Sequence, residues 1–225
     1  IDFQIKEKTK AGANYFHNLV INGTSAASGT GYVTGTFDGL KKILSGSDTE
    51  YTSAVDISTS ALMDSNYNAY LDELDGFISK LAEKPDILLM NNELLTKTRA
   101  AARRAGFYER SVDGFGRTVE KYNGIPMMDV GQYYNGTKTV DVIETTTPSA
   151  TAYGETAIYA AKLGLNAFHG ISVEGSKMVH TYLPDLNAPG AVKKGEVEML
   201  AGAVLKNSKM AGVLKGIKVK PKTAG

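Results

Sequence analysis

The sequence NYFHNLVING at residues 14–23 is followed, after a loop of small residues, by TFDGLKKIL at residues 36–44. The first segment has the spacing of one apolar helix face, and its Asn22-Gly23 pair can supply the left-handed residue that closes a helix. The loop, residues 24–35, consists mostly of Ser, Thr, Ala and Gly, which cannot fill a core. The stretch therefore predicts two helices joined by a polar hinge. Their apolar positions are Tyr15, Phe16, Leu19 and Val20, then Phe37, Leu40 and Leu44.

The helix before the hinge extends back to residue 2, because Ile5 and Gly12 continue its apolar stripe while Lys6 and Lys8 are polar. The sequence begins at Ile1 and reads as helix interior at once, with no cap ahead of it. We therefore expect these residues to be part of a longer chain or of a processed product.

The strongest helical pattern lies at residues 67–81, after a polar, turn-rich segment at residues 56–66. Seven apolar side chains recur there at helical spacing and predict one buried face. Four acidic residues on the other face could suggest paired carboxylates for acid–base catalysis, but a solvated face is the simpler explanation. Pro85 ends this helix. The apolar residues are Tyr67, Tyr70, Leu71, Leu74, Phe77, Ile78 and Leu81, and the acidic ones are Asp72, Glu73, Asp75 and Glu83.

A short apolar run at residues 86–90 predicts a buried strand, and the next helix should cover residues 93–105. Asn92 can cap that helix and Gly106 can end it. Three arginines near its end invite a phosphate site, but anions favour helix N-termini. We therefore expect them to complement the helix dipole or to contact neighbouring chains. These residues are Arg99, Arg103 and Arg104.

The remaining sequence predicts β-structure. Asn123-Gly124, between residues 119–122 and 125–130, is a strong hairpin signal, and DGFG at residues 113–116 marks a turn. Residues 184–195 read as an extended crossing segment. Further strands are expected at residues 139–143, 156–161, 168–173, 178–182, 196–205 and 213–219.

The composition is that of an ordinary globular protein, with 42% hydrophobic and 22% charged residues. A chain of 225 residues can form one or two domains, and roughly 70–75% of its unfolded surface can be buried. No apolar run approaches the ~18 residues of a membrane span, so no membrane partner is predicted. The absence of cysteine excludes disulfides and thiolate chemistry.

The net charge of +1 hides an asymmetry along the chain. Residues 193–225 carry eight lysines and two glutamates, a net charge of +6, while the rest carries 17 basic and 22 acidic residues. A solvated basic end is the simpler interpretation. The alternative is contact with an acidic partner, either a neighbouring subunit or packaged nucleic acid, although no nucleic-acid recognition motif is present.

No catalytic, cofactor or metal site is predicted. His17 has no partner at ligand spacing, and the G-x-S-x-G spacing of a nucleophile elbow is broken at residues 170–175. His169 and Ser172 with an Asp would have the residue types of a catalytic triad, but in a chain with three histidines such a coincidence carries little weight. Gly29-Thr30-Gly31 lacks the third glycine and the strand–helix setting of a dinucleotide loop. The sequence therefore indicates a protein that needs no cofactor and is not an enzyme.

Six short motifs follow one another along the chain. Asn22-Gly23 is followed by FDGL at residues 37–40, by PDILLMN at residues 85–91 and by NGIPM at residues 123–127. TAIYA at residues 156–160 and then FHGI at residues 168–171 complete the set. In this order the motifs resemble the major capsid proteins of tailed bacteriophages, which have the Hong Kong 97-type fold, and in particular their GP7-like branch.

The resemblance implies an α+β fold with two discontinuous domains. Residues 1–34, with a long spine helix, and residues 190–225, with return strands, would form a peripheral domain. Residues 35–189 would form an axial domain that meets its copies at capsomer centres. In such a fold the termini meet, so the first helix should pack against the two C-terminal strand runs.

The function that the resemblance implies is structural: the major capsid subunit of an icosahedral phage or prophage shell around double-stranded DNA. The protein would lie in the virion, and in the host cytoplasm during assembly. Its partners would be copies of itself in hexamers and pentamers, packaged DNA bound without sequence preference, and a scaffold or protease during assembly.

The family's N-terminal arm and its long β-hairpin, the E-loop, have no counterpart in residues 1–225. We therefore expect these residues alone to form monomers or weak, salt-sensitive oligomers rather than closed shells. Some capsids of this fold form Lys–Asn cross-links, for which the donor lysine lies in the E-loop. Asn207 is the asparagine in the C-terminal region, and we predict no cross-link there.

Two other functions stay open at this point. An encapsulin-like nanocompartment shell shares the fold and packages enzymes, and it would differ by a groove for cargo peptides. A small α/β hydrolase is the alternative from a different class, and a screen of ester and phosphate substrates would test it.

Overall fold

The computed structural model describes residues 2–25, 27–28, 31–32, 36–106, 109–112, 118–147, 149, 152–175, 177–185, 187 and 194–222. Its helices are α1 (Asp2–Asn22), α2 (Leu40–Ile43), α3 (Ser60–Ser79) and α4 (Asn92–Arg104), with a 3₁₀ turn, η1 (Ser208–Met210). In this described part, no helix combines the length and the apolar character that a membrane crossing requires. The predicted turn at residues 113–116 lies outside the described residues.

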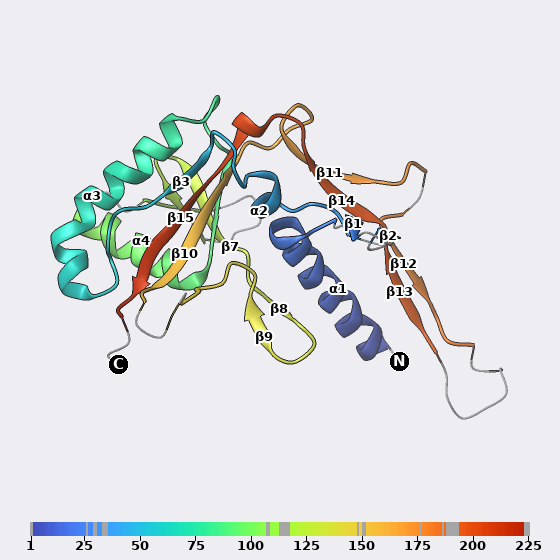
Figure 1. The fold of residues 1–225 in the computed structure, drawn as a ribbon. Coiled ribbons are helices and arrows are strands. Elements are labelled where there is room, and N and C mark those ends of the chain that lie inside the picture. The colour runs from blue at the N-terminus through green and yellow to red at the C-terminus, as the bar shows by residue number, and fades with distance from the viewer. Residues whose placement is uncertain are drawn as a thin grey trace.

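A seven-stranded mixed sheet forms the centre of the larger part of the molecule (Figure 1). In spatial order its strands are β3 (Glu50–Thr52), β15 (Ala211–Lys220), β10 (Gly154–Ala161), β4 (Ile87–Met90), β7 (Ile125–Asp129), β6 (Thr118–Tyr122) and β5 (Glu109–Val112). β3 runs parallel to β15 and β4 runs parallel to β7, while the other neighbours are antiparallel. The sheet therefore joins segments from all along the chain.

Both faces of this sheet are covered. Along β10, Ile158 and Ala160 face a core formed with α3 and α4, whereas Tyr159 and Ala161 face a second core. The second core includes Ile21 at the end of α1 and residues of α2. A strand buried on both faces has no place for polar side chains, which is why β4 reads ILLM without interruption.

A β-bulge at Gly216 keeps the apolar side chains of β15 inside. Ile158 pairs with Leu214 and Thr156 pairs with Ile217, so two steps along β10 correspond to three along β15. Gly216 has a φ of +74°, in the left-handed region that favours glycine. The bulge thereby places Leu214 and Ile217 in the same core.

α3 carries the predicted apolar face but begins earlier than predicted. Six of the seven predicted positions are buried, and Tyr67 packs against the same core. The helix begins at Ser60 because the Thr59 hydroxyl accepts a hydrogen bond from the Leu62 N–H at 3.2 Å. That side-chain cap lies in the segment that the sequence predicted as turns.

α4 confirms the predicted strand–helix pair, with one correction at its start. The cap is Asn91 rather than Asn92, since the Asn91 Oδ1 accepts a hydrogen bond from the Leu94 N–H at 2.9 Å. At the other end Gly106 has a φ of +81°, so the predicted glycine stop is confirmed.

Asn91 also connects α4 to the strands around it. Its side chain is 1% exposed, and its amide donates to the Ile143 carbonyl at 3.0 Å. The same amide nitrogen lies 3.1 Å from the hydroxyls of Thr145 and Thr156. One buried amide therefore holds the start of α4, residues 143–145 and β10 together.

The predicted hairpin between β6 and β7 is confirmed. Tyr122 pairs with Ile125, which leaves a two-residue turn. Asn123 and Gly124 have φ values of +50° and +74°, and a type I′ turn needs positive φ at both positions.

In the part of the chain that the structure describes, four two-stranded antiparallel sheets lie outside the large sheet. α1 lies between two of them, the β8–β9 hairpin and the β12–β13 ribbon, and contacts β8 and β13 (Figure 1). The pairs are β1 (Ala27–Ser28) with β2 (Gly31–Tyr32), β8 (Gln132–Tyr134) with β9 (Thr139–Asp141), β11 (Phe168–Ser172) with β14 (Ala201–Leu205), and β12 (Val179–Tyr182) with β13 (Glu196–Met199).

The sequence predicted that both C-terminal strand runs pack against α1, and only one of them does. The run at residues 196–205 forms β13 and β14, and β13 does contact α1. β15 instead lies inside the large sheet, where only its first residues, Ala211 and Val213, share a core with Ile21 of α1. Its position depends on pairing with distant strands, which the local pattern of apolar residues does not specify.

Candidate assembly surfaces

The hinge after α1 is closed by two glycines. The Gly39 N–H donates a hydrogen bond to the Gly23 carbonyl at 2.9 Å. A Cβ on Gly23 would lie 2.3 Å from the Phe37 carbonyl oxygen, and a Cβ on Gly39 would lie 2.6 Å from the Ile21 carbonyl oxygen. Both positions therefore need glycine because the backbones approach closely. The prediction of a left-handed residue at Asn22 or Gly23 was wrong, since neither has a positive φ.

Asp38 forms hydrogen bonds across the base of the loop between these glycines. Its Oδ1 accepts hydrogen bonds from the Ser25 N–H and the Ser25 hydroxyl, both at 2.7 Å, and from the Lys42 ammonium at 2.8 Å. The hydrogen bonds from Lys42 and Ser25 lower the pKa of this carboxyl to about 2. The carboxylate thus ties the two sides of the loop together at the surface.

Phe37 and Leu40 attach the same segment to its surroundings. The Phe37 ring lies 5.8 Å from the Phe16 ring of α1, measured between centroids, and Leu40 is fully buried in the core that contains Ile21. Each position of the FDGL motif therefore has a structural role. Together these contacts fix the direction in which α1 runs away from the large sheet.

Most of α1 beyond this joint has little cover from the rest of the chain. Phe3 is 74% exposed and Tyr15 is 49% exposed. A Cβ placed on Gly12 would have no atom within 4 Å. The helix therefore presents an open surface with large apolar side chains, which is typical of interaction sites.

Among the described residues, the largest group of exposed apolar side chains lies on and next to the strands β11 and β12 of the β11–β14 and β12–β13 ribbons. Each member of the group is at least 50% exposed. Ribbons of two strands are marginally stable alone, and their outer edges offer unpaired backbone groups to another chain. The members are Ile171, Val173, Met178, Tyr182 and Leu183. We call this group the ribbon patch.

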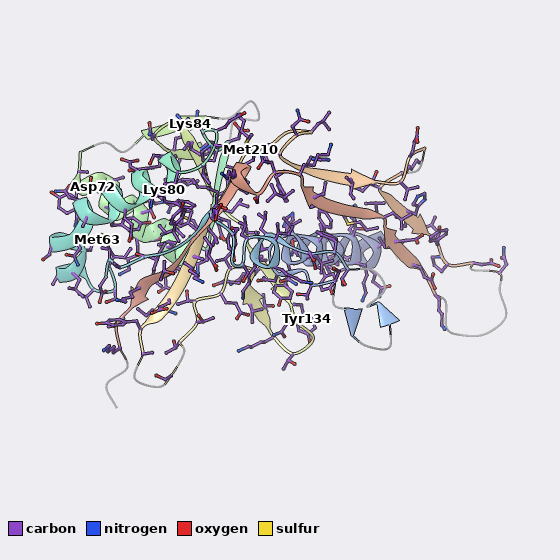
Figure 2. The ribbon with its side chains drawn as sticks, turned by 45° about the horizontal axis from the view of Figure 1, so that its top comes forward. Met63, Asp72, Lys80, Lys84, Tyr134 and Met210 are labelled. Carbon is purple, nitrogen blue, oxygen red and sulfur yellow. The ribbon has the colours of Figure 1, made fainter. Side chains whose placement is uncertain are left out.

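Two smaller apolar sites lie at connections. Leu163 and Leu165, 50% and 75% exposed, lie in the turn between β10 and β11. Asp86 holds that turn, since it accepts hydrogen bonds from the Leu163 N–H at 2.9 Å and the Lys162 ammonium at 3.2 Å. Tyr134, 63% exposed, ends β8 on the hairpin beside α1 (Figure 2).

The C-terminal lysines are used partly within the chain, which reduces the charge available to an acidic partner. Lys215 pairs with Glu50 at 2.6 Å, and Lys220 pairs with Glu93 at 3.3 Å. Two cation–π contacts join Lys218 and Lys222 to the Tyr153 ring, at 5.1 Å and 4.9 Å from its centre.

Two of the three arginines of α4 also have partners inside the chain. Arg99 forms an ion pair with Glu120, and Arg104 pairs with Asp64 at 2.5 Å. On the predicted acidic face of α3, Glu73 is likewise engaged rather than only solvated, because it accepts a hydrogen bond from the Ala54 N–H at 2.9 Å. These charged residues connect elements of one molecule.

The structure does not assemble the candidate catalytic residues. His17 is exposed on α1. His169 and Ser172 are three residues apart on β11, and side chains at that spacing point to opposite faces of a strand. Among the described residues, no group of three or more His, Asp or Glu side chains could hold a metal ion. Asn207 caps η1, where its side chain accepts a hydrogen bond from the Lys209 N–H at 3.0 Å.

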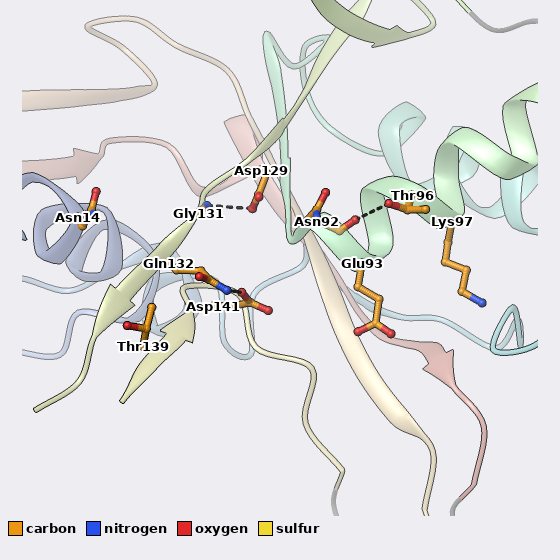
Figure 3. A pocket seen from close by; sticks show the side chains of 10 residues that line it. All are labelled: Asn14, Asn92, Glu93, Thr96, Lys97, Asp129, Gly131, Gln132, Thr139 and Asp141. Atoms are coloured by element: carbon orange, nitrogen blue, oxygen red, sulfur yellow. Dashed lines mark hydrogen bonds between the residues drawn. The ribbon is translucent and has the colours of Figure 1, made fainter. Parts of the chain in front are cut away.

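A polar cleft of about 850 Å³ lies between α1, the start of α4 and the β8–β9 hairpin (Figure 3). Its carboxylates are occupied by local contacts. Asp129 accepts a hydrogen bond from the Gly131 N–H at 2.9 Å, Asp141 accepts one from the Gln132 amide at 2.7 Å, and Glu93 pairs with Lys220. The cleft therefore offers a polar surface rather than a set of free reactive groups.

No protein-family model and no curated protein matches this sequence. The solved structures that are similar to it include the following two. The cryo-EM structure of the holo-SrpI encapsulin complex from Synechococcus elongatus has a TM-score of 0.55 and 13% identity, and the match covers 79% of this chain and 56% of that one. A prophage protein of Escherichia coli, assigned as a capsid protein, has a TM-score of 0.41 and 12% identity, with 68% and 47% covered.

The likeness to the encapsulin confirms the predicted fold class. The chain has the Hong Kong 97-type α+β fold, with a large mixed sheet, two helices packed on one of its faces and a long helix with ribbons beside it. This chain spans about half the length of the solved structures that it matches, 56% and 47% respectively. The GP7-like branch stays a prediction.

Proposed function

We propose that this protein is a structural subunit of a closed shell built from many copies of the chain, and that it is not an enzyme. The observation that carries the proposal is the uncovered apolar surface of the ribbon patch and α1, on a fold shared with an encapsulin. Burying one large apolar side chain contributes about 1.5–3 kcal/mol, so neighbouring copies would gain by covering these surfaces.

The shell that we propose is the capsid of a tailed phage or prophage, enclosing double-stranded DNA. The ordered motifs from Asn22-Gly23 to FHGI at residues 168–171 support this choice. Copies of the chain would form hexamers and pentamers, with a scaffold or protease acting during assembly in the host cytoplasm. DNA would be held without sequence preference, because no recognition element lies among the described residues.

We also propose a division of the chain into two parts. The seven-stranded sheet with α3 and α4 would form the axial part, and α1 with the ribbons β11–β14 and β12–β13 would form the peripheral part. Compared with the boundaries predicted from the sequence, β15 joins the axial part while β11 and β12 join the peripheral one. The hinge at Gly23 and Gly39 would then join the two parts.

An encapsulin-like compartment is the second candidate function. The TM-score of 0.55 to the SrpI encapsulin favours it over unrelated structural roles. Such a shell would enclose a protein cargo in place of DNA.

The contents of purified particles decide between the two candidates. The full-length protein is expressed with its neighbouring genes, particles are isolated and treated with nuclease, and their contents are extracted. Nuclease-protected double-stranded DNA is expected for the capsid. A co-purifying protein in fixed proportion, without DNA, would support the encapsulin, and the absence of any particle would contradict both.

A further inference from the structure

A second cavity lies on the face of the sheet opposite α3 and α4, next to α2 and the strands β3, β10 and β15. Its volume is about 560 Å³, within the range of small-molecule sites. Small residues, Ala157 and Gly216, line it beside larger polar ones, since the bulge of β15 puts glycine at this point. Ile21 and Asn22 at the end of α1 line the cavity, which shares no residue with the ribbon patch.

Tyr159 is a buried polar side chain that opens into this cavity. It is 5% exposed, and its hydroxyl makes no hydrogen bond to any residue that the structure describes. Burial and then the Glu50 carboxylate raise its pKa to about 12, and Glu50 lines the same cavity. Tyr159 lines the cavity and its hydroxyl can both donate and accept a hydrogen bond, so it is suited to contact a bound ligand.

Two of the three carboxylates in the cavity are free to bind a ligand. Glu50 is occupied by the Lys215 ammonium at 2.6 Å and the Gly46 N–H at 2.8 Å. Within the described part of the chain, the Glu144 and Glu155 carboxylates form no hydrogen bond or ion pair.

The pairing of residues 144–146 with β10 brings Glu144 and Glu155 close together. Thr146 pairs with Glu155 in an antiparallel bridge, and the Glu144 carbonyl accepts a hydrogen bond from the Thr156 hydroxyl at 3.2 Å. Side chains two apart on a strand share a face, so Glu155 lies on the face of β10 that carries Tyr159, and Glu144 lines the same cavity.

We propose that this cavity binds an organic cation, a ligand with a primary amine or guanidinium group, between the carboxylates of Glu144 and Glu155 and the hydroxyl of Tyr159. Carboxylates form the strongest hydrogen bonds with cationic N–H donors, and a phenol oxygen can accept a further one. The same group could come from a free polyamine or from a lysine or arginine side chain of a peptide. The proposal does not depend on the function proposed above.

Lys41 provides a test of opposite sign. It lines the same cavity from α2, is exposed, and forms no ion pair with a described residue. A bound cation would be repelled by its ammonium. Removing that charge should therefore tighten binding, whereas removing a carboxylate should weaken it.

Isothermal titration calorimetry at low salt tests the proposal, with putrescine, acetyl-lysine methylamide and arginine amide as probes. Saturable binding of one probe per chain is expected. The double variant Glu144→Gln/Glu155→Gln should weaken it about tenfold or more, and Tyr159→Phe should weaken it by a smaller factor. Lys41→Gln should tighten it. The control Glu93→Gln/Asp141→Asn, in the other cleft, should leave it unchanged.

The outcomes distinguish the two sources of the cationic group, and they show which results would overturn the site. Tighter binding of putrescine identifies a free polyamine, and tighter binding of the amides identifies a basic side chain; both support the site. No saturable binding of any probe up to roughly 10 mM would overturn it, and so would equal weakening by the control variant. Unfolding of the double variant, seen as a lost thermal transition, leaves Tyr159→Phe and Lys41→Gln to decide, and unchanged affinity in both would overturn the site.

Discussion

The backbone N–H of Gly39 donates a hydrogen bond to the carbonyl of Gly23 at 2.9 Å. These residues lie on opposite sides of the polar loop, so the bond joins the end of α1 directly to the start of α2. A Cβ at either position would overlap a backbone oxygen. The glycine pair therefore sets the direction in which α1 runs away from the large sheet. That direction places the exposed surface of α1, which we propose to contact neighbouring copies.

The first prediction concerns this close approach. Gly23→Ala should lower the free energy of unfolding by about 2–3 kcal/mol, the usual cost of forcing atoms into a packed site. Gly12→Ala is the matched control, since its Cβ meets no atom within 4 Å. Because alanine favours helix over glycine, the control should be stabilised by about 0.5–1 kcal/mol. Urea unfolding of both variants checks this, and equal midpoints would show that the hinge is not closed as described.

The second prediction tests which asparagine caps α4. Asn91→Ala removes the cap and leaves the buried Ile143 carbonyl without its donor, so a loss of about 2–4 kcal/mol is expected. Asn92→Ala, next to it and exposed, should change stability by less than about 0.5 kcal/mol. Thermal unfolding distinguishes the two. A larger loss in Asn92→Ala would mean that the cap lies where the sequence placed it.

The third prediction is a pH dependence that comes from Asp38. The pKa of its carboxyl falls from the ordinary 3.8 to about 2 in the folded protein. A carboxyl whose pKa is lower in the folded than in the unfolded protein stabilises the fold at pH values above its unfolded-state pKa. This stabilisation is lost as the pH falls through the folded-state pKa. Urea midpoints of the native protein should therefore drop between about pH 4 and pH 2.

Two variants isolate the Asp38 contribution. Asp38→Asn cannot titrate, so its midpoint should fall less steeply over the same pH range. Lys42→Ala removes the largest cause of the lowered pKa and should also flatten the profile. Glu50 and Asp86 also have lowered pKa values, because Lys215 and the Leu163 N–H respectively hold them charged, so some acid sensitivity should persist. Profiles of identical slope in all three proteins would contradict the contacts that Asp38 makes with Ser25 and Lys42.

Local patterns predicted much of the fold. The apolar face of α3 follows from helical spacing alone, and the Asn123-Gly124 hairpin follows from the φ values that only such residues adopt easily. The bulge also has a signal in the sequence. Leu214 and Ile217 are three apart with Gly216 between them, and that spacing breaks the period of a regular strand.

Other features depend on contacts between distant segments. Gly23 reads as a helix stop, and the sequence does not show that a Cβ there would also overlap the distant Phe37 carbonyl oxygen. Asn91 and Asn92 are equivalent as caps in the sequence, and the hydrogen bond from Asn91 to the distant Ile143 carbonyl distinguishes them. Four of the five residues of the ribbon patch lie in the stretches predicted as strands, 168–173 and 178–182, and the sequence could not show that these apolar side chains lack a core. The cavity beside Tyr159 has no local signal, since its carboxylates come from segments that lie far apart in the sequence.

Electron microscopy of the full-length protein, combined with light scattering, tests the central claim most directly. The account predicts closed particles of uniform size. It also predicts that Ile171→Lys/Leu183→Lys, two changes in the exposed ribbon patch, abolishes them without changing the thermal unfolding temperature by more than a few degrees. The exposed pair Lys206→Glu/Lys209→Glu serves as a control for a change of charge alone. A native protein that stays monomeric at high concentration, or a ribbon variant that assembles normally, would contradict the account.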